Sequence, residues 1–551
     1  MSGVHVLIVG AGGVFGSRLA RLLARRGGYR LSLGGRTESR VAPLQRELRA
    51  LDPDGEFSFV HIDREQASPD RLREIGCAIV VDCSGPFQLS GTRLIEAAIG
   101  ARCHYLDLAD SRAFVGGIGR FDSAARAVGI AVISGASSTP GLSHAVLDSI
   151  TSAWLSVDSV DVAIIPGNRT PKGRSVIDGI LSWVGQTVAV FREGDWQQGR
   201  GWSGGRRVVI EGLKPRTAFL ADVPDLDLLP RRYQPRVRAG FDAGMELGVL
   251  NRLIGLAGLL VRWRLVKSAR VFTGLGTWVA LRLDRFGSTD GGMVVDAAGQ
   301  DARGETRVVR WTLKAGQGDG PYVPVAPAAA LVEALAYGSR GIRAGARSAA
   351  GELTLDKIRP WFDGLAIELK AVAYRGERPL YRRAMSESFD RLPEVTRRLH
   401  RGRPATIAVG EAEVTPAANA VGALLARLFG LPCIAGRQPL RMVIESREGR
   451  EHWTRVFAGT AMRSVVSLAP GGRIEERLGP FRLQLRLVAK SHGLDYEQLS
   501  GRLWGVPLPD FLLPKIKAEE RVDEYRRHAF DVEITAPLAG RLVAYKGWLE
   551  V

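Results

Sequence analysis

The sequence predicts an α/β protein that begins with a Rossmann-type, doubly wound parallel sheet and continues with an α+β middle domain and a β-rich antiparallel C-terminal domain. Strand-like and helical runs alternate up to about Thr151, the two kinds are mixed from about Trp154, and short strands separated by turns follow Leu380. Repeated strand–helix units imply parallel strands with a ligand crevice at their carboxyl ends. A chain of 551 residues has room for about three domains. We expect them at 1–152, 153–376 and 378–551.

The first strand–turn–helix unit carries a glycine-rich turn. An apolar strand over 5–9 leads into Gly10, Gly13 and Gly16, and a helical pattern then ends at a Gly-Gly pair. The spacing is a variant of G-x-G-x-x-G, whose glycines allow a sharp turn, bring backbone N–H groups close to a pyrophosphate and let helix and strand pack closely. The helix N-terminus attracts the phosphates. A turn without a ligand is the alternative interpretation.

The second strand-like run, 29–40, indicates which dinucleotide the turn would bind. Where an NAD enzyme would carry an acidic residue, this chain has Gly35, Arg36 and Thr37. The Arg36 guanidinium suits a ribose 2′-phosphate, and the Thr37 hydroxyl offers a second donor. We therefore expect NADP(H), with a solvated surface arginine as the alternative.

The rest of the first domain completes the alternating pattern. Ser68 and Pro69 are typical of the start of a helix. A polar, turn-forming tip follows the apolar strand at 77–87. We expect strands at 57–63, 77–87, 104–110 and 130–136, and helices at 68–76, 91–101 and 121–129.

The middle region mixes strand-like and helical runs, unlike either flanking region. This mixture is typical of an α+β domain that binds substrate or forms a homodimer. Its most apolar stretch, 247–263, is too short and too interrupted to span a membrane. We favour a buried helix there, although the nearby Arg262, Arg264 and Lys267 would suit contact with an anionic membrane surface. We expect strands at 157–167, 206–213, 291–299 and 306–316, and helices at 174–191 and 327–338.

The C-terminal region opens with two helical runs and continues as strands. Turns rich in glycine and proline separate the strands, which indicates an antiparallel sheet. A curved sheet of this kind either encloses an apolar pocket, which would take up an acyl-chain-like ligand, or forms a filled scaffold. The expected helices are 380–392 and 417–428, and the expected strands are 439–447, 451–459, 464–469, 481–490, 494–504, 529–537 and 540–549.

Composition excludes several classes of function. The formal net charge is +18, but the arginines are scattered, so we do not expect a nucleic acid partner. The four cysteines form no C-x-x-C pair, which argues against a disulfide framework and a zinc site, and we expect no metal. The first residues carry no basic and apolar leader, so we expect a cytoplasmic protein.

Four phrases of the sequence together resemble the saccharopine dehydrogenase-like NADP-binding family, which includes trans-acting enoyl reductases. The phrases are GAGGVFG, LGGRTESR, DCSGPFQLSGTRLIEAAIGARCHYLDLAD and GDGPYVPVAPAAALVEALAYG, and the likeness covers 4–376. The last region is similar to an uncharacterised bacterial domain through EHWTRVFAG, LGPFRLQLRLV and GRLVAYKGWL. The resemblance implies a phosphate turn at Gly10, Gly13, Val14, Phe15 and Gly16, a 2′-phosphate site at Arg36 and Thr37, an adenine-side Asp63, and a nicotinamide-side loop at Ser84, Gly85 and Pro86.

The sequence gives its weakest indication for the residue that donates the proton. No Tyr is followed four residues later by Lys, so the catalytic pair of short-chain dehydrogenases is absent. Tyr105 and Asp107 at the end of the fifth strand are our catalytic candidates. The alternative is that Tyr105 packs and Asp107 caps a loop. Where the family often continues with Gly-Glu, this chain has Ala109 and Asp110.

Two functions remain open at this point. The first is an NADPH-dependent oxidoreductase that acts on an unidentified small organic substrate, for which the apolar middle helix suggests apolar character. The second is a non-catalytic NADP(H)-binding scaffold or sensor with a C-terminal domain that holds a hydrophobic ligand.

Overall fold

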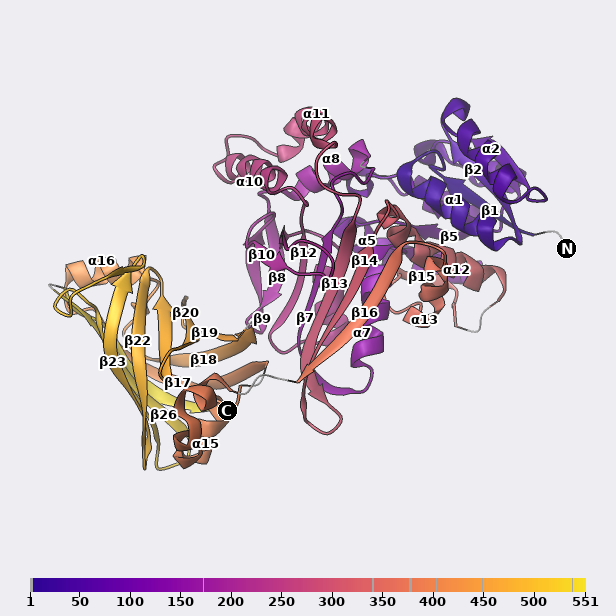
Figure 1. The fold of residues 1–551 in the computed structure, drawn as a ribbon. Helices are drawn as coiled ribbons and strands as arrows, with labels where there is room; N and C mark the ends of the chain where they lie inside the picture. Colours follow the sequence, from indigo (N-terminus) through magenta and orange to yellow (C-terminus); the bar gives the residue numbers. More distant parts are fainter. Residues whose placement is uncertain are drawn as a thin grey trace.

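The structure is a computed structural model that describes residues 3–171, 173–338, 341–375, 379–402, 404–447, 449–537 and 539–551. Figure 1 shows an N-terminal α/β unit, a middle unit built on a mixed sheet, and a C-terminal barrel. This arrangement confirms the predicted fold class. The domain boundary expected between 376 and 378 lies outside the described residues.

The N-terminal unit is a seven-stranded parallel sheet in the order β15-β6-β5-β4-β1-β2-β3. Strand β1 lies inside the sheet, and Val6, Leu7 and Ile8 are fully buried, as its unbroken apolar run predicts. The chain builds one side of β1 first and then the other, so the strand order reverses between β1 and β4, where ligands bind in such sheets. The strands are β1 (Val4–Val9), β2 (Tyr29–Gly35), β3 (Phe57–His61), β4 (Ile79–Asp82), β5 (His104–Asp107), β6 (Ala131–Ser134) and β15 (Gly345–Ser348).

Helices cover both faces of this sheet, and one of them comes from much later in the chain. Helix α12 (Ala326–Ala336) packs against α1 (Val14–Arg26) and against β4 and β5. It is alanine-rich and buried over most of its length, and β15 extends the sheet shortly afterwards. The chain therefore returns to the first sheet from a region that the sequence pattern assigns to the middle domain. The other helices are α2 (Ala42–Leu51), α3 (Pro69–Ile75), α4 (Arg93–Ala101), α5 (Arg112–Gly116), α6 (Asp122–Ala127) and α13 (Leu355–Ile358).

The middle unit is a nine-stranded mixed sheet in which β7 (Trp154–Ile165) pairs in parallel with β12 (Arg238–Ala243) and antiparallel with β13 (Gly291–Asp301). Its other strands are β8 (Thr187–Arg192), β9 (Asp195–Arg200), β10 (Arg206–Val208), β11 (Arg216–Leu220), β14 (Thr306–Ala315) and β16 (Ile367–Arg375). Its helices are α7 (Ser143–Thr151), α8 (Arg174–Trp183), α9 (Asp225–Tyr233), α10 (Gly248–Arg262) and α11 (Thr273–Leu283).

The strand expected over 206–213 is shorter, because β10 ends at Val208, and two expected helices of the middle unit also differ from the structure. The helix expected over 174–191 ends at Trp183, because Gly185 has a positive φ of 76° and a Cβ there would lie 2.5 Å from the Gly258 carbonyl oxygen. Strand β8 follows. The helix expected to be buried at 247–263 is α10, and only one of its faces is buried, because side chains such as Leu253 and Leu256 are about half exposed.

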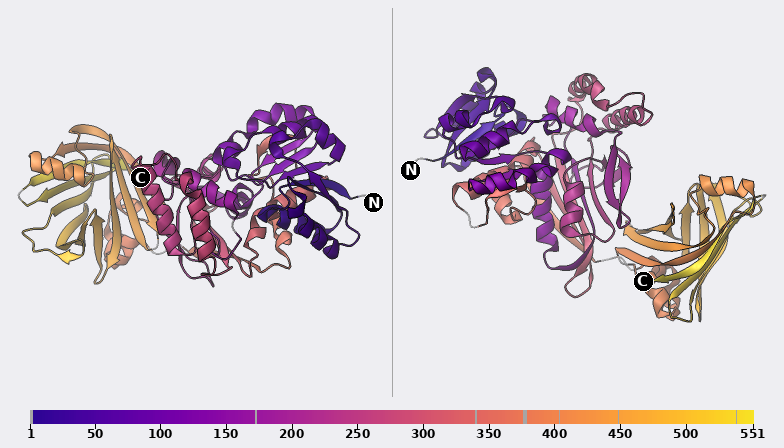
Figure 2. Two further views of the ribbon diagram at one scale, coloured as in Figure 1. Left: turned by 90° about the horizontal axis from the view of Figure 1, so that it is seen from above. Right: turned by 180° about the vertical axis from the view of Figure 1, so that it is seen from behind.

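The C-terminal region is an antiparallel sheet of eleven strands that closes on itself, because β22 pairs with both β21 and β23. Its apolar core contains only residues from 380–549, and Figure 2 shows that the barrel adjoins the middle unit and lies apart from the N-terminal unit. The strands are β17 (Ala405–Pro416), β18 (Gly436–Arg447), β19 (Arg450–Phe457), β20 (Thr460–Ala469), β21 (Arg473–Leu478), β22 (Phe481–Lys490), β23 (Gly493–Leu503), β24 (Val506–Pro507), β25 (Lys515–Val522), β26 (His528–Ala536) and β27 (Gly540–Glu550). The helices are α14 (Leu380–Met385), α15 (Glu394–Leu399) and α16 (Ala420–Leu428).

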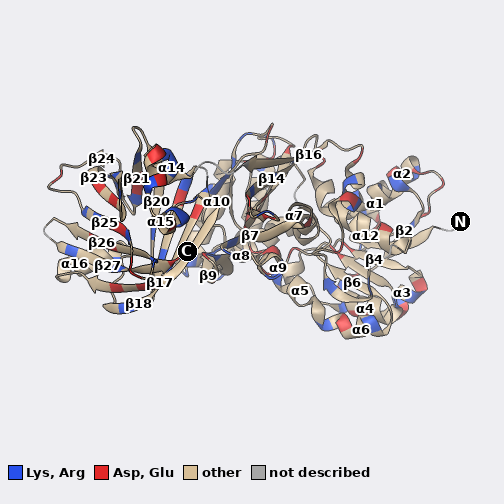
Figure 3. Ribbon diagram, turned by 90° about the horizontal axis from the view of Figure 1, so that it is seen from below, with Lys and Arg blue, Asp and Glu red and all other residues tan. Residues whose placement is uncertain are grey.

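Basic and acidic side chains are spread over all three units (Figure 3). The four cysteines are free thiols. Within the described ranges, no helix has the length and apolar character that a membrane span requires. The same residues contain no group of three or more His, Cys, Asp or Glu side chains placed to hold a metal ion.

Candidate functional site

A cavity of about 870 Å³ lies at the carboxyl ends of the parallel strands, at the reversal point beside β1 and β4. Its volume lies in the upper part of the range of about 300–1,000 Å³ that is usual for small-molecule sites. Its walls come from both the N-terminal and the middle unit. They include Gly10, Gly13, Val14, Phe15, Arg36, Thr37, Asp63, Ser84, Gly85 and Pro86, and also Gly173, Ser175 and Val176 at the start of α8. Every expected cofactor residue except Gly16 therefore lines the cavity.

The glycine turn forms a cradle of backbone groups at one end of the cavity. Gly10 has a positive φ of 80°, and its N–H donates to the Gly34 carbonyl at 2.9 Å. Gly13 precedes the first turn of α1, and no side chain caps that helix, so the positive end of the helix faces the cavity. A Cβ at Gly16 would lie 2.3 Å from the Gly10 carbonyl oxygen, so Gly16 serves the close packing of helix on strand.

Two arginines stand at the cavity rim beyond β2. Arg36 and Arg40 are both exposed, and neither forms an ion pair within the described ranges. Thr37 lies between them on the same wall. Unpaired guanidinium groups at this position suit a phosphate on the adenosine ribose. A carboxylate at the same place would instead repel that phosphate.

The loop after β4 is held by a buried ion pair that the sequence analysis did not find. Asp82 Oδ1 accepts hydrogen bonds from the Ser84 N–H at 2.9 Å and from the Ser84 hydroxyl at 2.5 Å. Asp82 Oδ2 lies 3.2 Å from Arg64 Nη2, and Arg64 Nη1 donates to the Ser84 carbonyl at 3.1 Å. The Arg64 guanidinium also lies 5.0 Å above the Phe87 ring. These contacts fix Ser84, Gly85 and Pro86 against the cavity.

Comparison with known families agrees with this geometry. Residues 6–133 match the family described as the saccharopine dehydrogenase NADP binding domain. This region is an NADP-binding domain. Residues 392–549 match a domain of unknown function, DUF4166. Both resemblances predicted from the sequence are confirmed, and so is NADP(H) as the cofactor.

Solved structures give weaker likenesses. The chain is similar to apo saccharopine dehydrogenase (L-Glu forming) from Saccharomyces cerevisiae, with 13% identity and a TM-score of 0.49 over 68% of this chain and 100% of that chain. A metagenomic short-chain oxidoreductase in complex with NADP has 18% identity and a TM-score of 0.20 over 24% of this chain and 81% of its own. A putative dehydrogenase from Burkholderia cenocepacia with bound NADP has 16% identity and a TM-score of 0.20 over 24% and 68%. No curated protein matches the chain in sequence.

The two catalytic candidates, Tyr105 and Asp107, lie behind the wall of the NADP-binding domain's cavity. Both are fully buried, and neither lines the cavity. The Tyr105 hydroxyl donates to Asp82 Oδ2 at 3.4 Å. Asp107 Oδ1 accepts from the Ala109 N–H at 3.0 Å, the Ser134 hydroxyl at 2.9 Å and the Gly135 N–H at 2.8 Å. Burial raises the pKa of Asp107 to about 6 although these bonds favour its charged form. Through these hydrogen bonds, Tyr105 and Asp107 link the ends of neighbouring strands.

Unlike Asp107, the nearby Asp110 does line the cavity of the NADP-binding domain. It accepts a hydrogen bond from the Gln88 side chain, Nε2 to Oδ1, at 3.1 Å. Asp110 is exposed to the open cavity, and desolvation raises the pKa of its carboxyl group. The sequence has Ala109 and Asp110 where the family that it resembles often has Gly-Glu, and this difference could have identified Asp110 as a candidate.

Helix α8 lines both the cofactor cavity and a second, apolar cavity. Ser175 and Val176 line the cofactor cavity, and a Cβ at Gly179 would lie 3.3 Å from Gln88 Oε1. The following residues Ile177, Ile180 and Leu181 line a groove of about 230 Å³ that α8 forms with α10 and α11. The lining of this groove is almost wholly aliphatic and aromatic. One helix therefore lies between the cofactor cavity and an apolar groove.

The interior of the barrel is nearly filled. Its cavity is about 60 Å³, well below the range of about 300–1,000 Å³ that is usual for small-molecule sites. Buried polar groups occupy part of the interior: the Tyr496 hydroxyl donates to Glu520 Oε1 at 2.6 Å, and His400 Nε2 lies 2.9 Å from Glu520 Oε2. A cavity of this size is small for an acyl chain, so it favours the filled-scaffold alternative for this interior.

Proposed function

We propose that the protein is an NADPH-dependent oxidoreductase of the saccharopine dehydrogenase-like type, acting on an organic substrate that has an apolar part. The observation that carries this proposal is the shared wall of the 870 Å³ cavity, to which both the NADP-binding domain and α8 of the middle unit contribute. When bound, NADPH supplies a hydride to the substrate. The chain must bind and orient both molecules and provide the proton.

The proposed cofactor contacts follow from the cavity lining. The 10–15 turn binds the pyrophosphate through backbone N–H groups, and Gly16 allows the turn to pack. Arg36 and Thr37 hold the 2′-phosphate, and Asp63 lies on the adenine side. Ser84, Gly85 and Pro86 form the nicotinamide side, kept in place by Asp82 and Arg64. In this proposal these residues bind and orient the cofactor.

Asp110 is our candidate proton donor. A group that donates a proton near neutral pH needs a pKa raised toward that range, and desolvation moves the pKa of Asp110 in that direction. Gln88 orients the carboxylate through its amide. Tyr105 and Asp107, placed behind the wall, then act as positioning residues for the strand ends.

The apolar groove beside α8 supports the apolar character of the substrate. A polar reacting group would lie near Ser175, and an attached hydrocarbon would pass over α8 toward Ile177 and Ile180. Burying one methylene group contributes about 0.8 kcal/mol, so even a short chain would bind appreciably. Polar substrates would leave the groove unused.

A sensor without catalysis is the second candidate, and the burial of Tyr105 and Asp107 away from the cavity favours it.

A deuterium-transfer experiment distinguishes the oxidoreductase from the sensor. The protein is incubated with NADPH carrying deuterium at C4 and with lipid or polar cell extracts, and products are analysed by mass spectrometry. We expect label in a component of the lipid extract, lost with Gly13→Val and kept with Gly119→Val, whose added side chain meets open space. NADPH binding without label transfer to any extract would favour the sensor.

A further inference from the structure

Helices α10 and α11 expose an unusual amount of apolar surface. Of the 31 large hydrophobic side chains exposed in the described part of the chain, eleven lie between Val249 and Phe286. These 38 positions are a small fraction of the 551 residues, so the density of exposed hydrophobic groups is several times the average. We call this region the α10–α11 surface. Its members on the two helices include Leu253, Leu256, Leu275, Trp278 and Leu281, and Trp263 follows α10 directly.

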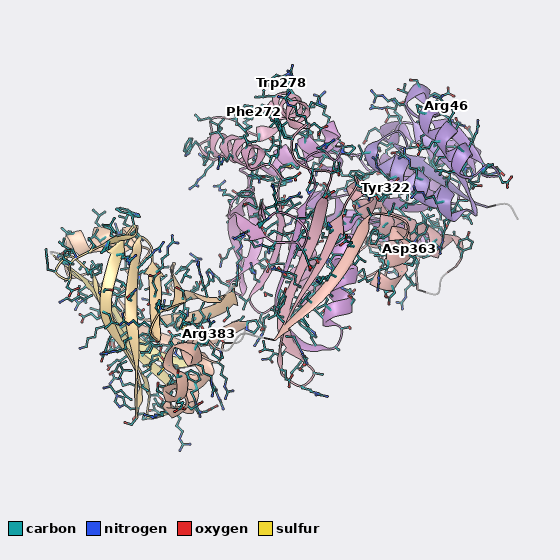
Figure 4. The ribbon with its side chains drawn as sticks, in the orientation of Figure 1. Arg46, Phe272, Trp278, Tyr322, Asp363 and Arg383 are labelled. Atoms are coloured by element: carbon teal, nitrogen blue, oxygen red, sulfur yellow. The ribbon has the colours of Figure 1, made fainter. Side chains whose placement is uncertain are left out.

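The α10–α11 surface is not part of the protein core. Helix α10 rests on the unit through Leu250, Gly258 and Val261, and α11 packs on α8. The opposite faces have no cover within the described residues. Both helices lie side by side at the outer edge of the middle unit (Figure 1), and Trp278 lies at its tip (Figure 4). Large apolar patches of this kind mark interaction sites.

The charges around the surface identify the partner. Seven lysines and arginines but a single acid, Asp284, lie between positions 249 and 286. Arg270 is paired with Asp178, whereas Arg282 and Arg285 lie about 5 Å from the aromatic rings of Trp278 and Phe286. Two copies joined through this surface would bring arginines against arginines. An anionic lipid bilayer accepts both the apolar and the basic groups.

We propose that the α10–α11 surface is a peripheral docking site for anionic membranes. Trp278, Leu281 and Leu256 enter the boundary between headgroups and acyl chains, and the arginines contact phosphate groups. The 230 Å³ apolar groove opens between the same helices, so docking brings its mouth to the hydrocarbon layer. Docking itself does not depend on the catalytic activity proposed above.

Vesicle flotation of the full-length protein tests this inference. Vesicles are made of phosphatidylcholine alone or of phosphatidylcholine mixed with phosphatidylglycerol. We expect binding to the mixed vesicles, and a loss of about tenfold or more in affinity with Trp278→Ser/Leu281→Ser or with Arg282→Glu/Arg285→Glu. Trp504→Ser on the barrel and Arg46→Glu on α2 are matched controls, because both positions are exposed elsewhere, and they should bind like the native protein.

Folding and self-association are measured on the same samples. Each variant should keep native NADPH affinity and circular dichroism, which shows that a lost interaction with vesicles is local. Failure of the native protein to float with the mixed vesicles would overturn the proposal, as would flotation that neither double variant weakens. A dimer that Trp278→Ser/Leu281→Ser dissociates, together with no vesicle binding, would overturn it in favour of a self-interface.

Discussion

The choice between NADPH and NADH depends on Arg36 at the rim of the cofactor cavity. Charge-assisted hydrogen bonds contribute about 1.5–3 kcal/mol. Arg36 is exposed, so solvent screens its contact with the 2′-phosphate, and we take the lower end of that range. About 1.5 kcal/mol corresponds to about tenfold in affinity. We therefore expect native protein to bind NADPH at least tenfold more tightly than NADH.

Substitution at this position should reverse the preference. With Arg36→Asp, a carboxylate would accept hydrogen bonds from the ribose hydroxyl of NADH and repel the 2′-phosphate of NADPH. Arg40 lines the same wall, so Arg36→Ala should keep a partial preference that Arg36→Ala/Arg40→Ala loses. Arg46→Ala is the matched control, since Arg46 is also exposed on α2 but does not line the cavity.

Calorimetric titration with both cofactors at low and high salt is the measurement. The advantage of NADPH should shrink as ionic strength rises, because salt screens an exposed charge pair. Equal affinities of the native protein for NADPH and NADH at low salt would refute the reasoning. So would an Arg36→Asp protein that still prefers NADPH.

Three further outcomes follow from the site and the barrel. Gly13→Val should abolish NADPH binding and leave the circular dichroism spectrum unchanged, because the new Cβ meets only the Gly10 carbonyl oxygen, at 3.1 Å, and the rest of the side chain enters the cavity. Turnover should fall as pH rises through the raised pKa of Asp110, since only its protonated form can donate; Asp110→Asn should flatten that limb while the Kd for NADPH stays constant. The fragment 379–551 should unfold in one cooperative thermal transition because its core is self-contained, and a fluorescent fatty acid should not bind it.

The N-terminal fold was predictable because its signals are local. An apolar run, glycines and a helical pattern follow one another within 5–26, and they form β1, the turn and α1 in that order. The return of α12 and β15 to the first sheet was not predictable, since no local signal tells a chain which of two sheets a later strand will join. In the barrel, β17, β21 and β25 were missed because polar and charged residues interrupt their apolar alternation.

The candidate site shows the same limit at the level of single residues. Tyr105 and Asp107 stand at the end of a parallel strand, which is where both catalytic and positioning residues occur, so sequence position cannot separate the two roles. Their partners can. Asp107 Oδ1 already accepts three hydrogen bonds from groups at two strand ends, and burial opposes the ionisation of Asp107. Asp110 accepts one hydrogen bond, from the Gln88 amide, and lines the cavity. A proton must leave from a group that a substrate can touch, and so Asp110 is the position at which to test for proton transfer.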